Sequence, residues 1–258
     1  RLGVRKAKGS IIISTDADCR FRNEWIGKMV TYFADSNVKL VCGPVCFSES
    51  NSFFSKLQSL EFISLIASAA GAIGISKSIF CNGANLAYRK KVFEQINISS
   101  TYDIASGDDV FLLHAIKEKY PDGIYFVRDK KAIVQTMNEN NVYSFINQRK
   151  RWTAKSISYT DKDTIFTSII VFLTNSIFLV LFFLGVLGRV SLIYFLLFLF
   201  VKFLVDMLLL YPVVKFFSKQ RLLKWIFPFE LVYAFYIICI VLISFTTSFR
   251  WKERIHRR

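Results

Sequence analysis

The sequence is poor in acidic residues, in histidine and in cysteine. Its 258 residues include 19 Asp or Glu against 34 Lys or Arg, with 2 His and 5 Cys. The odd number of cysteines and their spacing argue against a disulfide scaffold and a paired zinc motif, so we expect reduced thiols. With 53% hydrophobic and 21% charged residues, the composition also excludes an intrinsically disordered chain.

Long uncharged runs are the most prominent feature of the second half. Residues 165–187 and 231–248 contain no charged side chain, and a membrane-spanning helix needs ~20 mostly apolar residues. A further apolar segment covers residues 190–211, and the last one covers roughly residues 226–248, so we predict an integral membrane protein with two or three transmembrane helices. Three crossings would place the basic tail, residues 250–258, opposite the other basic flanks, which leaves the number open.

The net charge is +15, and the basic residues of the second half gather at the ends of the apolar segments. This pattern favours contact with membrane lipid headgroups and speaks against a nucleic-acid partner. Within the middle apolar segment, Lys202 and Asp206 are four residues apart and can pair on one helix face.

Residues before Asp163 alternate between strand-like and helix-like patterns. Residues 10–15 have the composition of a short, buried parallel strand, and residues 38–42, 123–127 and 132–135 are also strand-like. Helical spacing predicts helices over residues 23–34, 52–70, 110–119 and 142–159. We therefore expect an α/β domain over residues 1–163, followed by a membrane region over residues 164–258.

Two aspartates directly follow the first predicted strand. Asp16 and Asp18 are separated by one residue, so in an extended chain their carboxylates project to the same side. Carboxylates at the carboxyl end of a strand suit a divalent cation, Mg2+ or Mn2+, and a diphosphate. Taken alone, the pair is more typical of a solvated turn.

A second acidic pair, Asp108 and Asp109, precedes the predicted helix over residues 110–119. Helix capping needs only one carboxylate, and two adjacent ones repel each other. A carboxylate at this position could instead accept a proton from an attacking hydroxyl group. The pair by itself leaves capping and catalysis as alternatives.

A third group lies just before the membrane segments. Gln148, Arg151 and Trp152 occupy positions i, i+3 and i+4 of a predicted helix and share one face. Arginine is suited to holding a departing diphosphate, and tryptophan offers a flat surface to a sugar ring. Anchoring at the membrane interface is the alternative explanation for this group.

Three motifs follow one another along the chain: D-x-D after a strand, an acidic pair that opens a helix, and Q-x-x-R-W before membrane segments. In this order they resemble the motifs of the membrane-bound glycosyltransferases of family 2. That family includes the cellulose, chitin and hyaluronan synthases and bacterial single-addition enzymes. The resemblance implies a glycosyltransferase-A-like mixed sheet with flanking helices. It also implies a cytoplasmic catalytic region that transfers a sugar with inversion from a nucleotide-sugar donor to a lipid-linked or polysaccharide acceptor.

The resemblance also implies roles for individual residues. Asp16 and Asp18 would hold the donor diphosphate through the divalent metal, and Asp109 would be the catalytic base. Asp108 stands where many members have Glu. The remaining substrate-binding residues would come from the Q-x-x-R-W motif and from the turn over residues 81–85: Gln148, Arg151, Trp152 and Asn85. For the turn, an ordinary chain reversal is the alternative.

Family members begin with a nucleotide-binding half, whereas only nine residues precede Ser10 here. The resemblance therefore implies an N-terminally truncated piece that need not be active alone. A processive polysaccharide synthase is one alternative, although three segments make a polymer tunnel difficult to build, which favours single addition. A non-catalytic membrane scaffold or subunit is another, and a transporter that uses the pair Lys202 and Asp206 is disfavoured by the α/β region.

Overall fold

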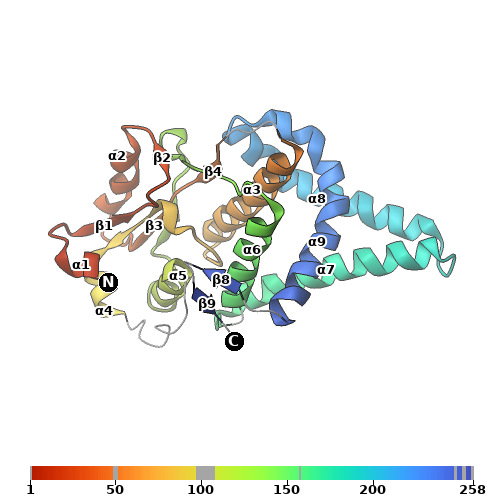
Figure 1. Cartoon of the computed structure of the whole chain (residues 1–258). Coiled ribbons are helices and arrows are strands. Elements are labelled where there is room, and N and C mark those ends of the chain that lie inside the picture. The colour runs from red at the N-terminus through yellow and green to blue at the C-terminus, as the bar shows by residue number, and fades with distance from the viewer. Residues whose placement is uncertain are drawn as a thin grey trace. The chain divides into compact units, whose positions relative to one another are not determined.

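The computed structural model describes residues 2–48, 52–96, 108–156, 158–246, 249–251 and 254–256 (Figure 1). The chain divides into two compact units, one formed by Arg1–Ser50 with Glu61–Asn138 and the other by Asn51–Leu60 with Glu139–Arg258. This division differs from the predicted boundary at residue 163. The reason is that helix α6, Val142–Ser156, packs against helix α9, Ile226–Thr246, within the second unit.

The first unit contains two mixed sheets. In the four-stranded sheet, ordered β1-β5-β3-β6, β5 is antiparallel to both its neighbours and β3 is parallel to β6. In the three-stranded sheet, ordered β2-β7-β4, β7 is antiparallel to β2 and parallel to β4. The strands are β1 Ile11–Ser14, β2 Arg20–Phe21, β3 Leu40–Cys42, β4 Val45–Phe47, β5 Leu86–Arg89, β6 Ile124–Phe126 and β7 Val134–Thr136.

These sheets confirm the predicted mixed α/β region, with one correction. Strand β1 was expected to be buried and parallel, but it is a half-buried edge strand that pairs antiparallel with β5. A short run of Ile residues reports apolar character and cannot reveal the direction of a partner strand. Strands β3 and β4 are fully buried and carry continuous apolar residues, as strands covered on both faces do.

Short helices pack around the sheets of the first unit. Helix α5, Asp108–Lys119, buries Leu113 and Ile116 completely. The other helical elements are α1 Leu2–Lys6, α2 Trp25–Val30, η1 Thr31–Ala34, η2 Gly83–Asn85, α4 Lys90–Gln95 and η4 Lys130–Ala132. Helix α3, Phe53–Gly74, is shared, because its residues up to Leu60 belong to the second unit and the rest to the first.

A buried amide joins three segments of the first unit. The Asn85 side chain is 0% exposed; its Oδ1 accepts a hydrogen bond from Trp25 Nε1 (2.9 Å), and its Nδ2 donates to the carbonyl oxygens of Pro44 (2.9 Å) and Ala132 (2.8 Å). A Cβ at Gly43 would lie 2.3 Å from this side chain, so only glycine fits there. Asn85 therefore holds the chain crossing between β3 and β4 in place.

The second unit consists mainly of long helices. They are α6 Val142–Ser156, α7 Lys162–Val186, α8 Leu192–Phe216 and α9 Ile226–Thr246, with η5 Gln220–Trp225 before α9. Helices α7 and α8 form a helical hairpin (Figure 1). Of the predicted basic tail, the described part is a backbone hairpin of β8, Phe249–Trp251, and β9, Arg254–His256.

Within the part of the chain that the structure describes, four helices are long and apolar enough to cross a membrane: Phe53–Gly74, Lys162–Val186, Leu192–Phe216 and Gln220–Ser244. The three predicted apolar segments are thus confirmed as helices, and the chain is indicated to be a membrane protein. Inside the protein, 56% of the apolar stretch of α3 is buried, compared with 11% for α7 and α8. Helix α3 therefore offers much less surface to lipid than α7 and α8 do.

An aromatic cluster fills the contact between α7, α8 and α9. Phe178, Phe195, Leu199 and Ala234 are all buried in it. The rings of Phe178 and Phe195 meet edge to face at 5.1 Å between centroids, which is a favoured geometry for aromatic pairs. These side-chain contacts hold α7, α8 and α9 against one another.

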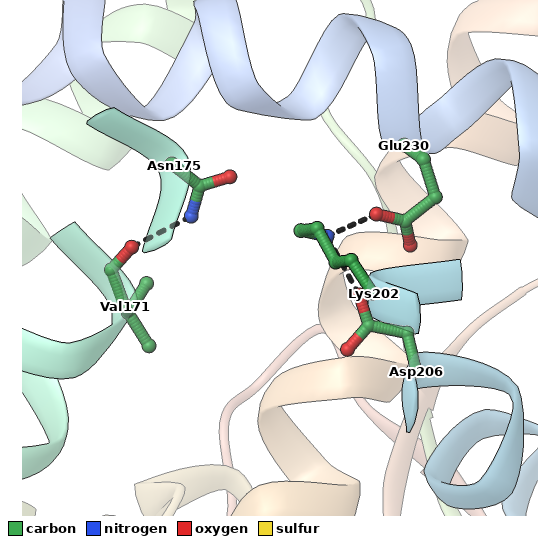
Figure 2. A network of polar contacts seen from close by, with 5 residues as sticks. All are labelled: Val171, Asn175, Lys202, Asp206 and Glu230. Atoms are coloured by element: carbon green, nitrogen blue, oxygen red, sulfur yellow. Dashed lines mark hydrogen bonds and ion pairs between the residues drawn. The ribbon is translucent and has the colours of Figure 1, made fainter. Parts of the chain in front are cut away.

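One helical turn from this cluster, the same helices carry polar side chains (Figure 2). Lys202 Nζ contacts Asp206 Oδ2 at 2.6 Å, which confirms the predicted pair, and it also contacts Glu230 of α9, which the sequence analysis did not foresee. Asn175 of α7 is buried and donates through Nδ2 to the Val171 carbonyl (2.7 Å). A charged residue this deep in an apolar bundle requires such partners.

Candidate active site

The first predicted pair lies in an exposed turn after β1. The backbone N–H of Cys19 donates to the carbonyl of Asp16 (3.2 Å) and closes the turn, and Asp18 Oδ2 accepts a hydrogen bond from the Thr136 hydroxyl (3.2 Å). One ligand atom each from Asp16, Asp18 and Cys19 all lie within 4.8 Å of one another. The two carboxylates could hold a hard divalent cation, since such ions prefer oxygen ligands.

Cys19 is a neighbour of this pair that the sequence analysis did not include. Burial raises the pKa of its thiol, against hydrogen bonds to the Asp16 backbone and the Thr15 side chain that lower it. The thiol is therefore protonated near neutral pH and is a poor metal ligand in that form. The oxygen ligands of the two aspartates remain the stronger candidates.

Hydrogen bonds of the turn η2 join the last residue of β1 to Asp109. Ser14 Oγ donates to the Gly83 carbonyl (2.9 Å), and the Gly83 N–H donates to Asp109 Oδ2 (2.9 Å). The other carboxylate oxygen of Asp109 accepts from the Val110 N–H (3.0 Å). Two hydrogen bonds thus link the last residue of β1 to the predicted base, and backbone donors fix the orientation of its carboxylate.

Cys81 supports Asp109 from the protein interior. Its Sγ donates to the Asp109 carbonyl (3.2 Å), and its side chain is buried. Burial, followed by the neighbouring Cys42 thiol, raises the pKa of Cys81 well above its ordinary value, so it acts as a neutral donor. Asp108, the first residue of α5, is exposed beside Asp109.

Asn85 was predicted to bind substrate, but the structure places its side chain in the interior of the first unit. All of its hydrogen bonds described above are to protein groups, and it is 0% exposed. It holds the turn that carries Gly83. A direct contact between Asn85 and a substrate stays a prediction. In this arrangement the Asn85 side chain has no exposed atom with which to make that contact.

The third predicted group belongs to α6 in the second unit. Gln148, Arg151 and Trp152 are half-buried, and Gln148 Nε2 donates to Glu139 Oε1 (2.8 Å). The Gln58 side chain holds the backbone of Glu139. Gln58 Nε2 donates to the Glu139 carbonyl, and the Glu139 N–H donates to Gln58 Oε1, each at 3.0 Å. Gln58 and Glu139 were missed by the sequence analysis, since their contact joins positions 81 residues apart.

A residue inside the Q-x-x-R-W motif, Arg149, connects its predicted members. The Arg149 guanidinium carbon lies 4.3 Å from the ring centroids of both Phe145 and Trp152, and the residue is 3% exposed. Its Nη1 also donates to Gln148 Oε1. The sequence held a signal for this contact, because Phe145, Arg149 and Trp152 follow helical i, i+4 and i+7 spacing.

Comparison with known protein families places the chain among the glycosyltransferases. The matching model is that of glycosyl transferase family 21, and it covers residues 2–257, so the chain belongs to this family. The predicted class of enzyme is thereby confirmed at the level of glycosyltransferase. A comparison with curated proteins finds no match.

Proposed function

We propose that the protein is an inverting hexosyltransferase that uses a nucleotide-sugar donor, with the D-x-D, acidic-pair and Q-x-x-R-W roles known from family 2. The first unit would then be the described part of a glycosyltransferase-A-like domain. The observation that carries the proposal is the hydrogen-bonded link from β1, which precedes Asp16 and Asp18, through Gly83 to Asp109. In support of the proposal, this link holds the Asp109 carboxylate two hydrogen bonds away from Ser14, the last residue of β1.

The proposed reaction is a single displacement. An acceptor hydroxyl oxygen forms a bond to the anomeric carbon while the bond from that carbon to the donor diphosphate breaks. Asp109 takes the hydroxyl proton, and the nucleoside diphosphate leaves with the electron pair of the broken bond. Displacement from the side opposite the leaving group inverts the anomeric configuration. Arg151 would stabilise negative charge on the departing diphosphate.

A divalent cation, Mg2+ or Mn2+, fits the exposed pair near β1. The observation in favour is that Asp16 and Asp18 offer oxygen atoms close enough together to share one ion. When bound, the ion would neutralise charge on the donor diphosphate. Asp16 and Asp18 would hold it, with Asp18 additionally oriented by the Thr136 hydroxyl.

The acceptor in this proposal is lipid-linked or a polysaccharide, reached from the cytoplasmic face. The basic side chains before α7 favour a cytoplasmic position for the catalytic region, because positive charge is retained on that side. Among the described residues of α7, α8 and α9, one layer of the helix contact is filled by aromatic and aliphatic side chains, and the next turn is occupied by the ion pairs of Lys202. This packing favours single addition over a processive synthase that threads a polymer between these helices.

The proposal is tested by sugar transfer in membranes that contain the full-length protein, assayed with a panel of nucleotide-sugars. Asp109→Asn should lower the transfer rate by at least about a hundredfold, because the amide cannot accept the hydroxyl proton. Expression and donor binding should be retained. Chelation of divalent ions should stop transfer, and added Mg2+ or Mn2+ should restore it.

Asp122→Asn is the matched control for this experiment, because Asp122 is an exposed aspartate of the same unit that lies outside the proposed site. It should retain the parent rate. Full activity of Asp109→Asn would remove the base assignment. Membranes that transfer sugar from none of the donors would instead favour a non-catalytic scaffold.

A further inference from the structure

The side chain of Arg149 lies between two aromatic rings on one face of α6. Phe145 is one helical turn before it and Trp152 one turn after it, each with its ring centroid 4.3 Å from the guanidinium carbon. Phe145 is itself held by Phe54 of α3 (5.4 Å) and Tyr236 of α9 (5.5 Å). Phe145 and Trp152 thus form an aromatic bracket around the Arg149 guanidinium. Through Phe145 this bracket is part of the packed interior of the second unit.

Arg149 also fixes the carboxamide of its neighbour. Its Nη1 donates to Gln148 Oε1, and Gln148 Nε2 donates to Glu139 Oε1 (2.8 Å). Arginine can only donate and a carboxylate can only accept, so the amide of Gln148 has a single favourable orientation between them. These two hydrogen bonds use one N–H and one lone pair of the amide.

Because Arg149 is 3% exposed, it has almost no surface with which to touch a substrate directly. The two side chains of the motif that its guanidinium contacts, Gln148 and Trp152, are half-buried and retain exposed surface. We propose that Arg149 is a positioning residue that holds the Gln148 amide and the Trp152 ring in the geometry required for the donor diphosphate and the acceptor. This inference rests on the roles given to those two residues in the proposed function.

Arginine is the residue type that this place requires. Its planar guanidinium can stack on an aromatic ring while its N–H groups donate in the same plane to an amide oxygen. A lysine ammonium is a point charge and cannot stack in this way. Since misplacement of a binding group by about 1 Å can cost on the order of a hundredfold in rate, loss of this bracket should be visible in kinetics.

The test compares Arg149→Met and Arg149→Lys with Lys155→Met, which removes a basic residue from the same helix outside the motif. Arg149→Met should lower kcat/KM for the donor by about ten- to hundredfold, with the donor KM raised as well as kcat lowered. Where stacking makes the larger contribution, Arg149→Lys should lose about as much kcat/KM as Arg149→Met does. Lys155→Met should have the kcat/KM of the parent. A merely structural role would reduce the amount of active enzyme and leave KM unchanged.

A double-mutant cycle separates positioning from direct contact. In a background with Gln148→Ala and Trp152→Ala, adding Arg149→Met should cost less than about threefold, because the groups it positions are gone. An equal loss in both backgrounds, or parent kinetics for Arg149→Met and Arg149→Lys, would overturn the inference. If Gln148→Ala with Trp152→Ala keeps full transfer activity, the proposed function of this motif fails together with the inference. If that background loses activity while both Arg149 variants keep it, the inference alone fails.

Discussion

The backbone N–H of Gly83 orients the carboxylate on which the proposed chemistry depends. A Cβ at this position would lie 3.3 Å from Asp109 Oδ2 and 3.5 Å from Asp109 Cβ, so an alanine would displace the Asp109 side chain by a few tenths of an ångström. We predict that Gly83→Ala lowers kcat about tenfold, because the base moves from its position at the attacking hydroxyl.

Steady-state transfer kinetics and thermal unfolding in detergent measure this effect separately. The melting temperature of Gly83→Ala should change little, since the contact is tight without being a severe overlap. Gly27→Ala provides the control, because a Cβ at Gly27 in α2 meets nothing within 4 Å. A parent value of kcat for Gly83→Ala would show that the position of Asp109 does not limit the reaction.

At the scale of elements, the ion pairs of Lys202 join α8 to α9. Lys202 has a side chain that is 10% exposed and Glu230 one that is 2% exposed. Lys202→Met would leave the carboxylates of Asp206 and Glu230 close together without their cation. We predict that it lowers the free energy of unfolding by about 3–5 kcal/mol, measured by denaturation in detergent.

Two further variants sharpen this prediction. Lys215→Met removes an exposed lysine near the end of the same helix and should leave stability unchanged. Replacing all three residues by apolar ones, Lys202→Met with Asp206→Leu and Glu230→Leu, should recover much of the lost stability, because an apolar cluster needs no charge compensation. Equal stability of Lys202→Met and the parent would show that the contact contributes nothing.

Sequence patterns predicted elements better than contacts between them. The long apolar runs, two of them uncharged, predicted α7, α8 and α9, since apolar length is the main signal for such helices. The same patterns missed the antiparallel pairing of β1 and the contact of Lys202 with Glu230, because both depend on which distant segment becomes a neighbour. In the candidate site, Asp16, Asp18 and Asp109 could be selected by residue type, whereas the Gly83 link and the Arg149 bracket are contacts in space.

For the whole molecule, the alternation of helices predicts on which side each connection lies. If the catalytic region is cytoplasmic and α7 and α8 both cross, the connection at Arg189 is outside and Ser218 is inside. Cysteines introduced by Arg189→Cys and Ser218→Cys, both at exposed positions, report this with a membrane-impermeant maleimide. Arg189→Cys should gain a label in intact cells, and Ser218→Cys only in inverted vesicles.

The parent protein is labelled alongside, because it has cysteines of its own. Labelling of Arg189→Cys from inverted vesicles alone would mean that α7 does not cross or that the orientation is reversed. A reversed orientation would also place the proposed nucleotide-sugar chemistry on the wrong side of the membrane, whereas an α7 that does not cross would leave it in the cytoplasm.

The phenylalanine packing between α7, α8 and α9 has a consequence for the fate of the product. Buried side chains from all three helices fill this contact. If the acceptor is a lipid at the inner leaflet, as proposed, this contact offers the product no path across the membrane. Its delivery to the outer surface would then call for a separate flipping protein.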